Sequence, residues 1–149
     1  DMIAVRLSSA FRFVVVGTPD YFARHGRPEK VADLAQHRCI RLRLSSGGMM
    51  PWTFQVGNRE EEAQVSGPVI VNDFSALMVA IRTGVALGMI AEPVAEAEIE
   101  AGNLEIALSE FAPSSAGLFL YYPSRKQVMP KLRAFIDYAR DHLPAHLRS

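Results

Sequence analysis

The residue pair in this sequence that is best suited to covalent chemistry is His37 and Cys39. A cysteine thiolate is a strong nucleophile, and a neighbouring imidazole can take its proton. The two residues stand two apart in a segment that is expected to be a strand, so their side chains should point to the same side. The sequence offers no recognisable third residue to orient the histidine. We therefore interpret His37 as a structural histidine and Cys39 as a buried thiol, and we expect no catalytic residues.

Carboxylates occur in two groups whose spacing could be taken for a metal site. Glu60, Glu61 and Glu62 follow one another next to a turn, whereas Glu92, Glu96 and Glu100 repeat every four residues along a predicted helix. Side chains four apart share one helix face, which is typical of a solvated surface. The single cysteine excludes both an internal disulfide and a cysteine-built zinc site. We expect no metal and no cofactor.

Polar residues also stand at two places where a predicted strand passes into a predicted helix. Thr18 and Pro19 follow the first of these strands, and Asn72 and Asp73 follow the second. Threonine, asparagine and aspartate cap helix N-termini, and proline suits the first helical position. The same place presents free N–H groups and the positive end of the helix dipole, which bind carboxylates and other anions. The sequence is therefore compatible with either role for these residues, helix capping or ligand binding.

Two arginines lie on a segment in which apolar and polar residues alternate. In residues 38–44, Arg41 and Arg43 stand at odd-numbered positions and Ile40 and Leu42 at even-numbered ones. This alternation predicts a half-buried strand. The simplest interpretation is a solvated arginine face. The alternative is that one of them pairs with an anionic ligand.

The chain is organised around residues 69–93, which predict a strand, a helix and a second strand. Phe74, Leu77, Met78 and Ile81 fall at offsets 0, 3, 4 and 7 of one helix face, so all four are expected in the core. Gly84 stands where helices commonly end in left-handed geometry. The two strands of such a unit should be parallel, with a right-handed crossover. Ligands in open α/β sheets bind at the carboxyl ends of strands, which here means residues 72–74.

Strands and helices alternate along the whole chain, which predicts the α/β class with mixed sheets. We expect strands at 2–7, 11–16, 38–44, 52–56, 62–66, 69–71, 85–91, 104–108 and 118–122, and helices at 19–25, 31–35, 74–81, 93–101 and from Pro130 onward. The first two strands are expected to join the last strand and helix. This arrangement predicts two lobes, one from residues 1–19 and 112–149 and the other from residues 20–111, with a cleft between them.

Composition narrows the function classes. The 149 residues are 49% hydrophobic and 21% charged with zero formal net charge, which is typical of a globular domain and argues against DNA binding by this chain alone. No apolar run approaches the roughly 20 residues that a membrane helix needs. The chain starts at Asp1 without a basic-then-apolar leader, so we expect no secretion signal and a fragment of a longer protein.

Five segments in fixed order resemble the effector-binding domain of LysR-type transcriptional regulators. They are DMIAVRL at 1–7, VVGTPDYF at 15–22 with HGRP at 25–28, DLAQHRCI at 33–40, VND at 71–73 with GVALG at 84–88, and YPSR at 122–125 with KLRAFI at 131–136. Each segment alone is a weak signal, but the ordered set spans nearly the whole chain.

The resemblance implies a two-lobed fold like that of periplasmic binding proteins, with a small-molecule effector, such as a small organic acid, in the cleft. It also implies an N-terminal helix-turn-helix domain that binds DNA, a cytoplasmic location and self-association into a homo-oligomer. Members of the family have a strand-helix-strand-helix segment before the part that matches residues 1–7. This chain lacks that segment, so we expect the first lobe to be incomplete.

The resemblance also implies that residues near Phe74 line the pocket, and that Thr18 stands where relatives often have serine. We expect one groove to reach both Thr18 and Asn72. The candidate ligand-binding residues are Thr18, Pro19, Asn72, Asp73, Phe74 and Arg41. We interpret the chain as an effector-sensing domain without catalysis. The alternatives are a solute-binding protein of an uptake system and, third, an enzyme on the same fold, which would need an acid/base pair that we do not find.

Overall fold

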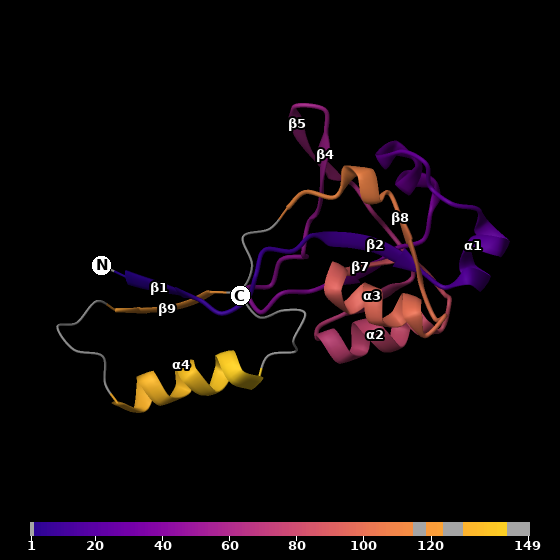
Figure 1. The fold of residues 1–149 in the computed structure, drawn as a ribbon. Coiled ribbons are helices and arrows are strands. Elements are labelled where there is room, and N and C mark those ends of the chain that lie inside the picture. The colour runs from indigo at the N-terminus through magenta and orange to yellow at the C-terminus, as the bar shows by residue number, and fades with distance from the viewer. Residues whose placement is uncertain (1, 115–118, 124–129, 143–149) are drawn as a thin grey trace. The chain divides into compact units, whose positions relative to one another are not determined.

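The computed structural model describes residues 2–114, 119–123 and 130–142 (Figure 1). Ser124 and Arg125 of the family-like segments lie outside these ranges. The chain divides into a terminal unit, made of Asp1–Phe11 and Ser114–Ser149, and a central unit, Arg12–Pro113. The terminal unit contains β1 (Met2–Arg6), β9 (Phe119–Pro123) and α4 (Pro130–His142).

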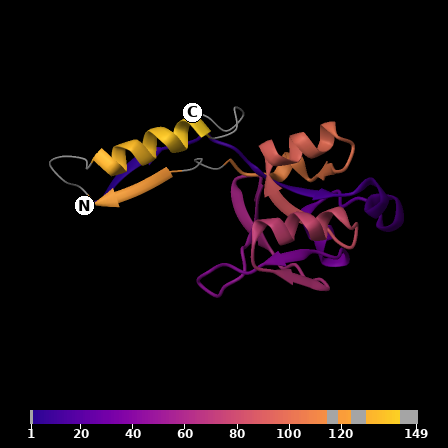
Figure 2. The same ribbon diagram turned by 90° about the horizontal axis from the view of Figure 1, so that it is seen from below.

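Within the terminal unit, the two strands that lie far apart in sequence pair with each other. β1 and β9 are antiparallel, from Met2 opposite Pro123 to Arg6 opposite Phe119, and α4 runs alongside them in both ribbon views (Figures 1 and 2). Ile136 of α4 is 5% exposed, whereas Phe135 is 53% exposed. The helix α4 therefore buries one of these apolar side chains and exposes the other.

The central unit is built on five strands in the order β6, β3, β7, β2, β8. Their bounds are β2 Phe13–Gly17, β3 Ile40–Leu42, β6 Val69–Val71, β7 Gly88–Ala91 and β8 Glu105–Ala107. β3 and β6 are parallel, and a parallel bridge between Cys39 and Leu87 joins β3 to β7. β2 pairs antiparallel with both β7 and β8. Four strands therefore share one direction, and β2 runs against them.

The placement of β2 corrects one prediction. The strand expected at residues 11–16 was assigned to the terminal strand and helix, but β2 lies in the central sheet. Val15 belongs to one core cluster and Val14 and Val16 to the other, so this strand is buried on both faces. A strand of that kind must lie inside a sheet that is covered on both sides, and β1 with β9 does not provide one.

Two layers cover the faces of the central sheet. One face holds α2 (Phe74–Arg82) and α3 (Glu92–Glu100), which lie near each other in both views (Figures 1 and 2) and are joined by the hydrogen bond from Arg82 Nε to Glu98 Oε1, 2.7 Å. On the helix α2, Leu77, Met78 and Ile81 are buried as expected. Gly84 then ends the helix with a φ of +77°, in the left-handed region.

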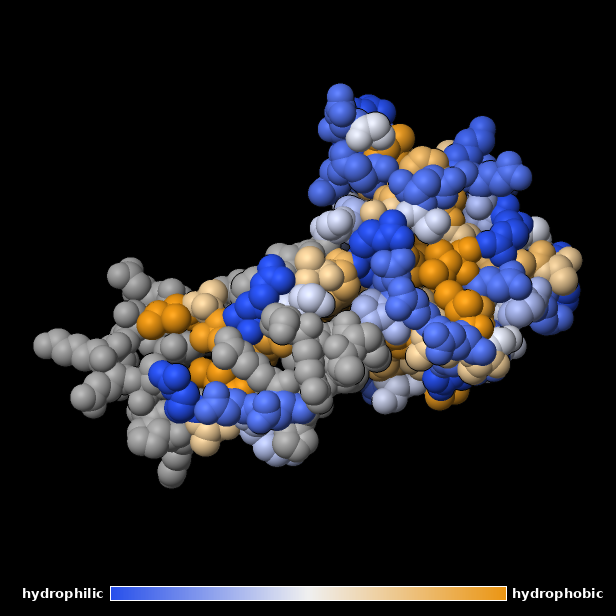
Figure 3. All heavy atoms as spheres, viewed as in Figure 1, coloured by the Kyte–Doolittle hydropathy of each residue, from blue (hydrophilic) through white to orange (hydrophobic). Residues whose placement is uncertain are grey.

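The other face holds α1 (Pro19–His25), the 3₁₀ helix η1 (Val31–Gln36) and the hairpin of β4 (Trp52–Val56) and β5 (Arg59–Ala63). Trp52 and Phe54 are buried against this face, while the hairpin's outer side is hydrophilic (Figure 3). The hairpin is confirmed, but its second strand begins three residues earlier than the range 62–66 that we expected. The two-residue turn Gly57-Asn58 places Val56 opposite Arg59, and that pairing sets the register.

After β8, the second 3₁₀ helix η2 (Ser109–Phe111) leads towards the end of the central unit. Among the described residues, no helix has the length and apolar character required to cross a membrane.

Candidate ligand-binding site

The strand directions divide the candidate residues between two ends of the central sheet. The four parallel strands end at Leu42, Val71, Ala91 and Ala107, and we call this the carboxyl end of the sheet. Because β2 is antiparallel, it begins at the carboxyl end and finishes at the opposite end, where Val16 lies beside Gly88, the first residue of β7. A residue that follows β2 is therefore separated from residues that follow β3 or β6 by the length of the sheet.

Asn72, Asp73 and Phe74 lie at the carboxyl end, between β6 and α2. Asp73 Oδ1 accepts a hydrogen bond from the backbone N–H of Ala76 at 2.7 Å, so the expected cap is confirmed for this residue. Asn72 is exposed, and its side chain makes no hydrogen bond with the described residues. Its amide is therefore available to a ligand.

Phe74 differs from the prediction that it belongs to the core, because it is 51% exposed. The helical spacing that groups it with Leu77 and Ile81 is correct, but β6 ends at Val71. The first turn of α2 therefore extends past the end of the sheet and has no strand residue beneath it. The result is an exposed aromatic ring beside the helix N-terminus.

Arg41 also lies near the carboxyl end, on the face of β3 opposite to α2. Cys39 packs in the cluster with η1 and the hairpin and Ile40 in the cluster with α2, so alternation places Arg41 on the side of Cys39. Its Nε atom is buried and has no hydrogen-bond partner among the described residues. A buried guanidinium nitrogen without an acceptor is costly, because it has lost its water and gained nothing. Arg43, by contrast, is exposed.

Thr18 and Pro19 lie at the opposite end of the sheet. Thr18 Oγ1 accepts a hydrogen bond from Tyr21 N at 3.0 Å and is 9% exposed, which confirms the cap of α1. The expectation that one groove reaches both Thr18 and Asn72 is wrong within this unit. It assumed that all strands end on the same side, whereas β2 runs antiparallel to the strand that precedes Asn72.

The geometry around Cys39 does not form a nucleophile and base pair. Burial raises the pKa of the Cys39 thiol to about 12, so the thiolate is not available near neutrality. His37 Nδ1 lies 2.7 Å from the hydroxyl of Tyr21, a residue that sequence reasoning did not select. Burial lowers the pKa of His37. The structural interpretation of both residues agrees with this arrangement.

Of the six glutamates in the two groups, Glu61 and Glu92 take part in ion pairs. No group of three or more metal-binding side chains lies together in the part of the chain that the structure describes. Glu61 pairs with Arg59 at 2.9 Å, and Glu96 and Glu100 are exposed. Glu92 departs from the expected solvated face, because it pairs with Arg12 at 2.6 Å with 25% of its side chain exposed.

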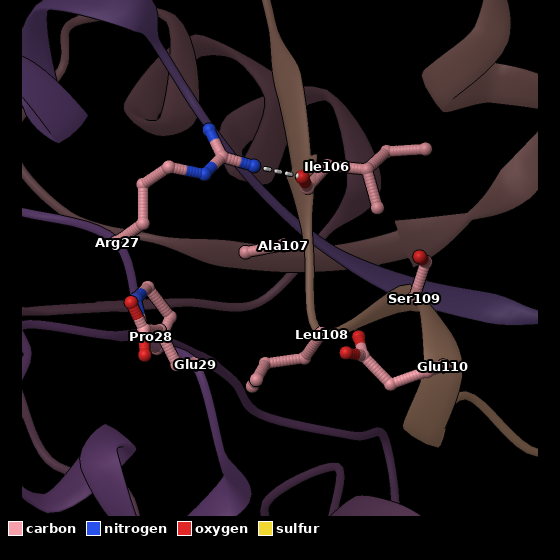
Figure 4. A pocket seen from close by; sticks show the side chains of 8 residues that line it. All are labelled: Arg27, Pro28, Glu29, Ile106, Ala107, Leu108, Ser109 and Glu110. Atoms are coloured by element: carbon pink, nitrogen blue, oxygen red, sulfur yellow. Dashed lines mark hydrogen bonds between the residues drawn. The ribbon is translucent and has the colours of Figure 1, made fainter.

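A groove of about 510 Å³ lies beside β8 (Figure 4), and none of the six candidate residues lines it. It is lined by Arg27, Pro28, Glu29 and residues 106–110. Arg27 Nη1 binds Glu105 Oε1 at 2.7 Å, and Nη2 donates to the carbonyl of Ile106. Because this lining cation already has its partners, the groove offers less to an anion than the carboxyl end does.

Comparison with known proteins gives a consistent result. The family model described as the LysR substrate binding domain matches residues 1–144. The HTH-type transcriptional regulator YcaN of Escherichia coli K12 is 34% identical over 140 residues, which cover 94% of this chain and 45% of that protein. A putative transcriptional regulator of Pseudomonas aeruginosa is 36% identical over 141 residues, 94% of this chain and 46% of that protein. The chain thus spans slightly less than half the length of these relatives.

Solved structures agree on the fold. The regulatory domain of AphB from Vibrio vulnificus superposes with a TM-score of 0.74 at 19% identity, covering 95% of this chain and 68% of that one. CrgA, a LysR-type transcriptional regulator from Neisseria meningitidis, superposes with a TM-score of 0.74 at 24% identity, covering 94% and 47%. The α/β fold like that of periplasmic binding proteins is confirmed, as is the resemblance found in the sequence. This chain belongs to the LysR substrate-binding domain family.

Proposed function

We propose that this chain is the effector-sensing part of a LysR-type transcriptional regulator, and that a small organic acid binds at the carboxyl end of its central sheet. The observation that carries the proposal is the buried Nε of Arg41, which has no partner among the described residues although it lies near the end of the sheet where α2 begins. A carboxylate would supply the missing acceptor and pair with the guanidinium.

Other groups at the carboxyl end of the sheet suit such a ligand. The N-terminus of α2 presents backbone N–H groups and a positive partial charge, which favour an anion. Asn72 offers both donors and an acceptor, and the exposed ring of Phe74 offers apolar contact. Asp73 contributes through its cap, which holds the first turn of α2 in place. Thr18 and Pro19 form the start of α1 at the opposite end, so they are not part of this site.

In this proposal the effector changes the population of arrangements of the two lobes, and DNA-binding domains elsewhere in the full-length regulator respond. The lobes are those expected from the sequence, residues 1–19 with 112–149 and residues 20–111, except that β2 belongs to the second lobe. The solute-binding alternative is disfavoured because the matched relatives are transcriptional regulators. The same relationship supports a cytoplasmic location, a non-enzymatic role and DNA contact through a helix-turn-helix domain of the full-length protein.

Self-association is part of the proposal as well. Val79 of α2 is 61% exposed and Ile70 of the outer strand β6 is 43% exposed, so neighbouring elements present apolar side chains to solvent. Surfaces of this kind are typical of contacts between protein chains.

The test is thermal unfolding of the full-length regulator with acetate, malonate, glutarate and benzoate. A bound acid should raise Tm in proportion to the logarithm of its concentration. Arg41→Gln and Asn72→Ala should lose this rise. Arg59→Gln serves as the control, because Arg59 is an exposed arginine of the hairpin. A panel without any rise in Tm, or an unchanged rise in Arg41→Gln, would refute the proposal.

A further inference from the structure

The guanidinium of Arg12 holds together three segments that lie far apart in the sequence. Its Nε and Nη2 donate to the two carboxylate oxygens of Glu92 at 3.1 and 2.6 Å. Its Nη1 donates to the carbonyl oxygen of Ser109 at 2.8 Å. The backbone adds a fourth bond, from Glu92 N–H to the carbonyl of Arg12 at 2.7 Å. All three guanidinium nitrogens therefore have an acceptor.

This geometry depends on arginine rather than on positive charge alone. A planar fork can face a carboxylate with two parallel N–H groups and still direct a third N–H elsewhere, whereas a lysine ammonium is a point charge on a flexible stem. The pair is only partly exposed, 33% for Arg12 and 25% for Glu92. The hydrogen bonds between them raise the pKa of Arg12 and lower the pKa of Glu92. Both side chains thus stay charged over the working pH range.

The bonded segments stand where the central unit begins and ends. Arg12 is its first residue, and Ser109 lies four residues before its last, Pro113. Glu92 joins the end of β7 to the start of α3, both of which belong to the core of the unit. Arg12 therefore ties the segment by which the chain enters the central unit, and the segment that leads to its exit, to the same rigid point.

We propose that Arg12 and Glu92 form a hinge clamp, a pair of positioning residues that fixes the two crossing segments relative to each other and so limits the movement between the two units. With both segments anchored at the same point, the freedom of movement is confined to the residues that follow the clamp on each segment. Without the clamp, the two segments are held only by the pairing of β2 with β7 and β8 and by the backbone bond from Glu92 to Arg12, so the residues beyond these pairs gain freedom and more orientations become accessible.

The clamp lies at the carboxyl end of the sheet. Phe13 pairs with Ala91, the last residue of β7, so Arg12 and Glu92 lie one residue beyond the paired strands. They are therefore at the same end of the sheet as Leu42 and Val71. If the proposed effector site is correct, ligand binding and the hinge share one end of one sheet, and coupling between them needs no long path. This consequence rests on the proposed function, but the clamp itself does not.

The test is the distribution of distances between nitroxide labels on the two units, measured by pulsed electron paramagnetic resonance without any ligand. Labels are attached through Ala23→Cys on α1 and Ala134→Cys on α4, both exposed positions. The native Cys39 is fully buried and stays unlabelled. We expect Arg12→Met to give a broader distribution than the unchanged chain, and Arg12→Lys and Glu92→Gln to give intermediate widths.

The control is Arg82→Met, which removes the ion pair of Arg82 with Glu98 between α2 and α3 in the same unit. It should lower Tm without broadening the distribution, because it does not touch the crossing segments. An Arg12→Met or Arg12→Lys variant that lowers Tm but keeps the original width would overturn the proposal and leave Arg12 a purely structural residue. If Arg12→Met does not fold, Arg12→Lys and Glu92→Gln decide the question. Because no acid is present, the result does not depend on the outcome of the effector test.

Discussion

The two ends of the central sheet differ in how fully their groups are satisfied. At the opposite end, Thr18 caps α1, and two glycines lie in close contact with their neighbours, Gly67 with backbone and Gly17 with side chains. A Cβ on Gly67 would lie 2.0 Å from the carbonyl oxygen of Cys39, and a Cβ on Gly17 would lie 2.7 Å from Leu87. This end is closed by packing and by local hydrogen bonds.

At the carboxyl end, the Arg12–Glu92 pair and the Asp73 cap are satisfied, but other polar and apolar groups are not. The Nε of Arg41 has no partner among the described residues, and Asn72 and Phe74 are exposed. Binding groups are commonly drawn from the less stable parts of a fold, because a group that is already satisfied has nothing to offer a ligand. On the proposed function, the closed end serves mainly stability and the carboxyl end serves recognition.

The largest effect should come from Gly67→Ala at the closed end. The added Cβ would meet the Cys39 backbone, which cannot move without disturbing the bridge to Leu87. We expect a loss of about 3 kcal/mol or more in the free energy of unfolding, measured with urea. Gly48→Ala is the matched control, because a Cβ there meets nothing within 4 Å. Equal stability of the two variants would contradict the idea of a closed end.

The next effect concerns the buried hydroxyl of Tyr21, also at the closed end. It accepts from the backbone N–H of Arg38 at 3.2 Å and shares a second hydrogen bond with His37 Nδ1 at 2.7 Å. Tyr21→Phe leaves both groups without this partner and should cost about 1–3 kcal/mol in urea unfolding. A loss no greater than that of an exposed control such as Gln55→Ala would show that the hydroxyl contributes nothing.

The burial of His37 also makes stability depend on pH. The pKa of His37 is lower in the folded chain than its ordinary value of about 6.5, so the unfolded chain binds the proton more readily. Stability is full above about pH 6.5 and decreases as the pH falls through that value towards the folded pKa. His37→Gln should flatten this decrease between about pH 7 and 5, while Glu92 and Glu98 titrate below that range because their pKa values are lowered from 4.5.

Features that depend on neighbouring residues were predictable from the sequence. Thr18 and Asp73 cap the expected helices, and Gly84 and Gly102 have positive φ where the expected helices end. Each of these features needs only the preferences of a few consecutive residues. They gave the helix positions and, with the family resemblance, the fold.

Features that depend on strand direction or on distant residues were not predictable. An apolar run such as residues 14–16 does not indicate whether the strand is parallel or antiparallel to its neighbours. The antiparallel direction of β2 was therefore not predicted, and Thr18 was expected at the carboxyl end of the sheet. Arg12 and Glu92 are 80 residues apart, and no local pattern pairs them. The exposure of Phe74 depends on where β6 stops relative to α2, which periodicity does not contain.

A smaller effect distinguishes the two helix caps. Thr18→Ala and Asp73→Ala should each cost about 1 kcal/mol in the free energy of unfolding, because each leaves one backbone N–H without its acceptor. Only Asp73→Ala should also weaken the rise in Tm that an acid ligand causes, since only α2 begins at the carboxyl end. The same weakening in Thr18→Ala would contradict the proposal that the ligand binds only at the carboxyl end of the sheet.

The smallest effect on stability should come from Arg41→Met. Removing a buried polar atom that has no partner, and keeping a side chain of similar length, should leave the free energy of unfolding within about 1 kcal/mol of the original and can raise it. Acid binding should be lost in the same variant, as judged by Tm with and without the acids. A group whose loss costs no stability yet abolishes binding is retained for its ligand. A large destabilisation by Arg41→Met would instead assign Arg41 to the packing of the fold and remove the contrast between the two ends.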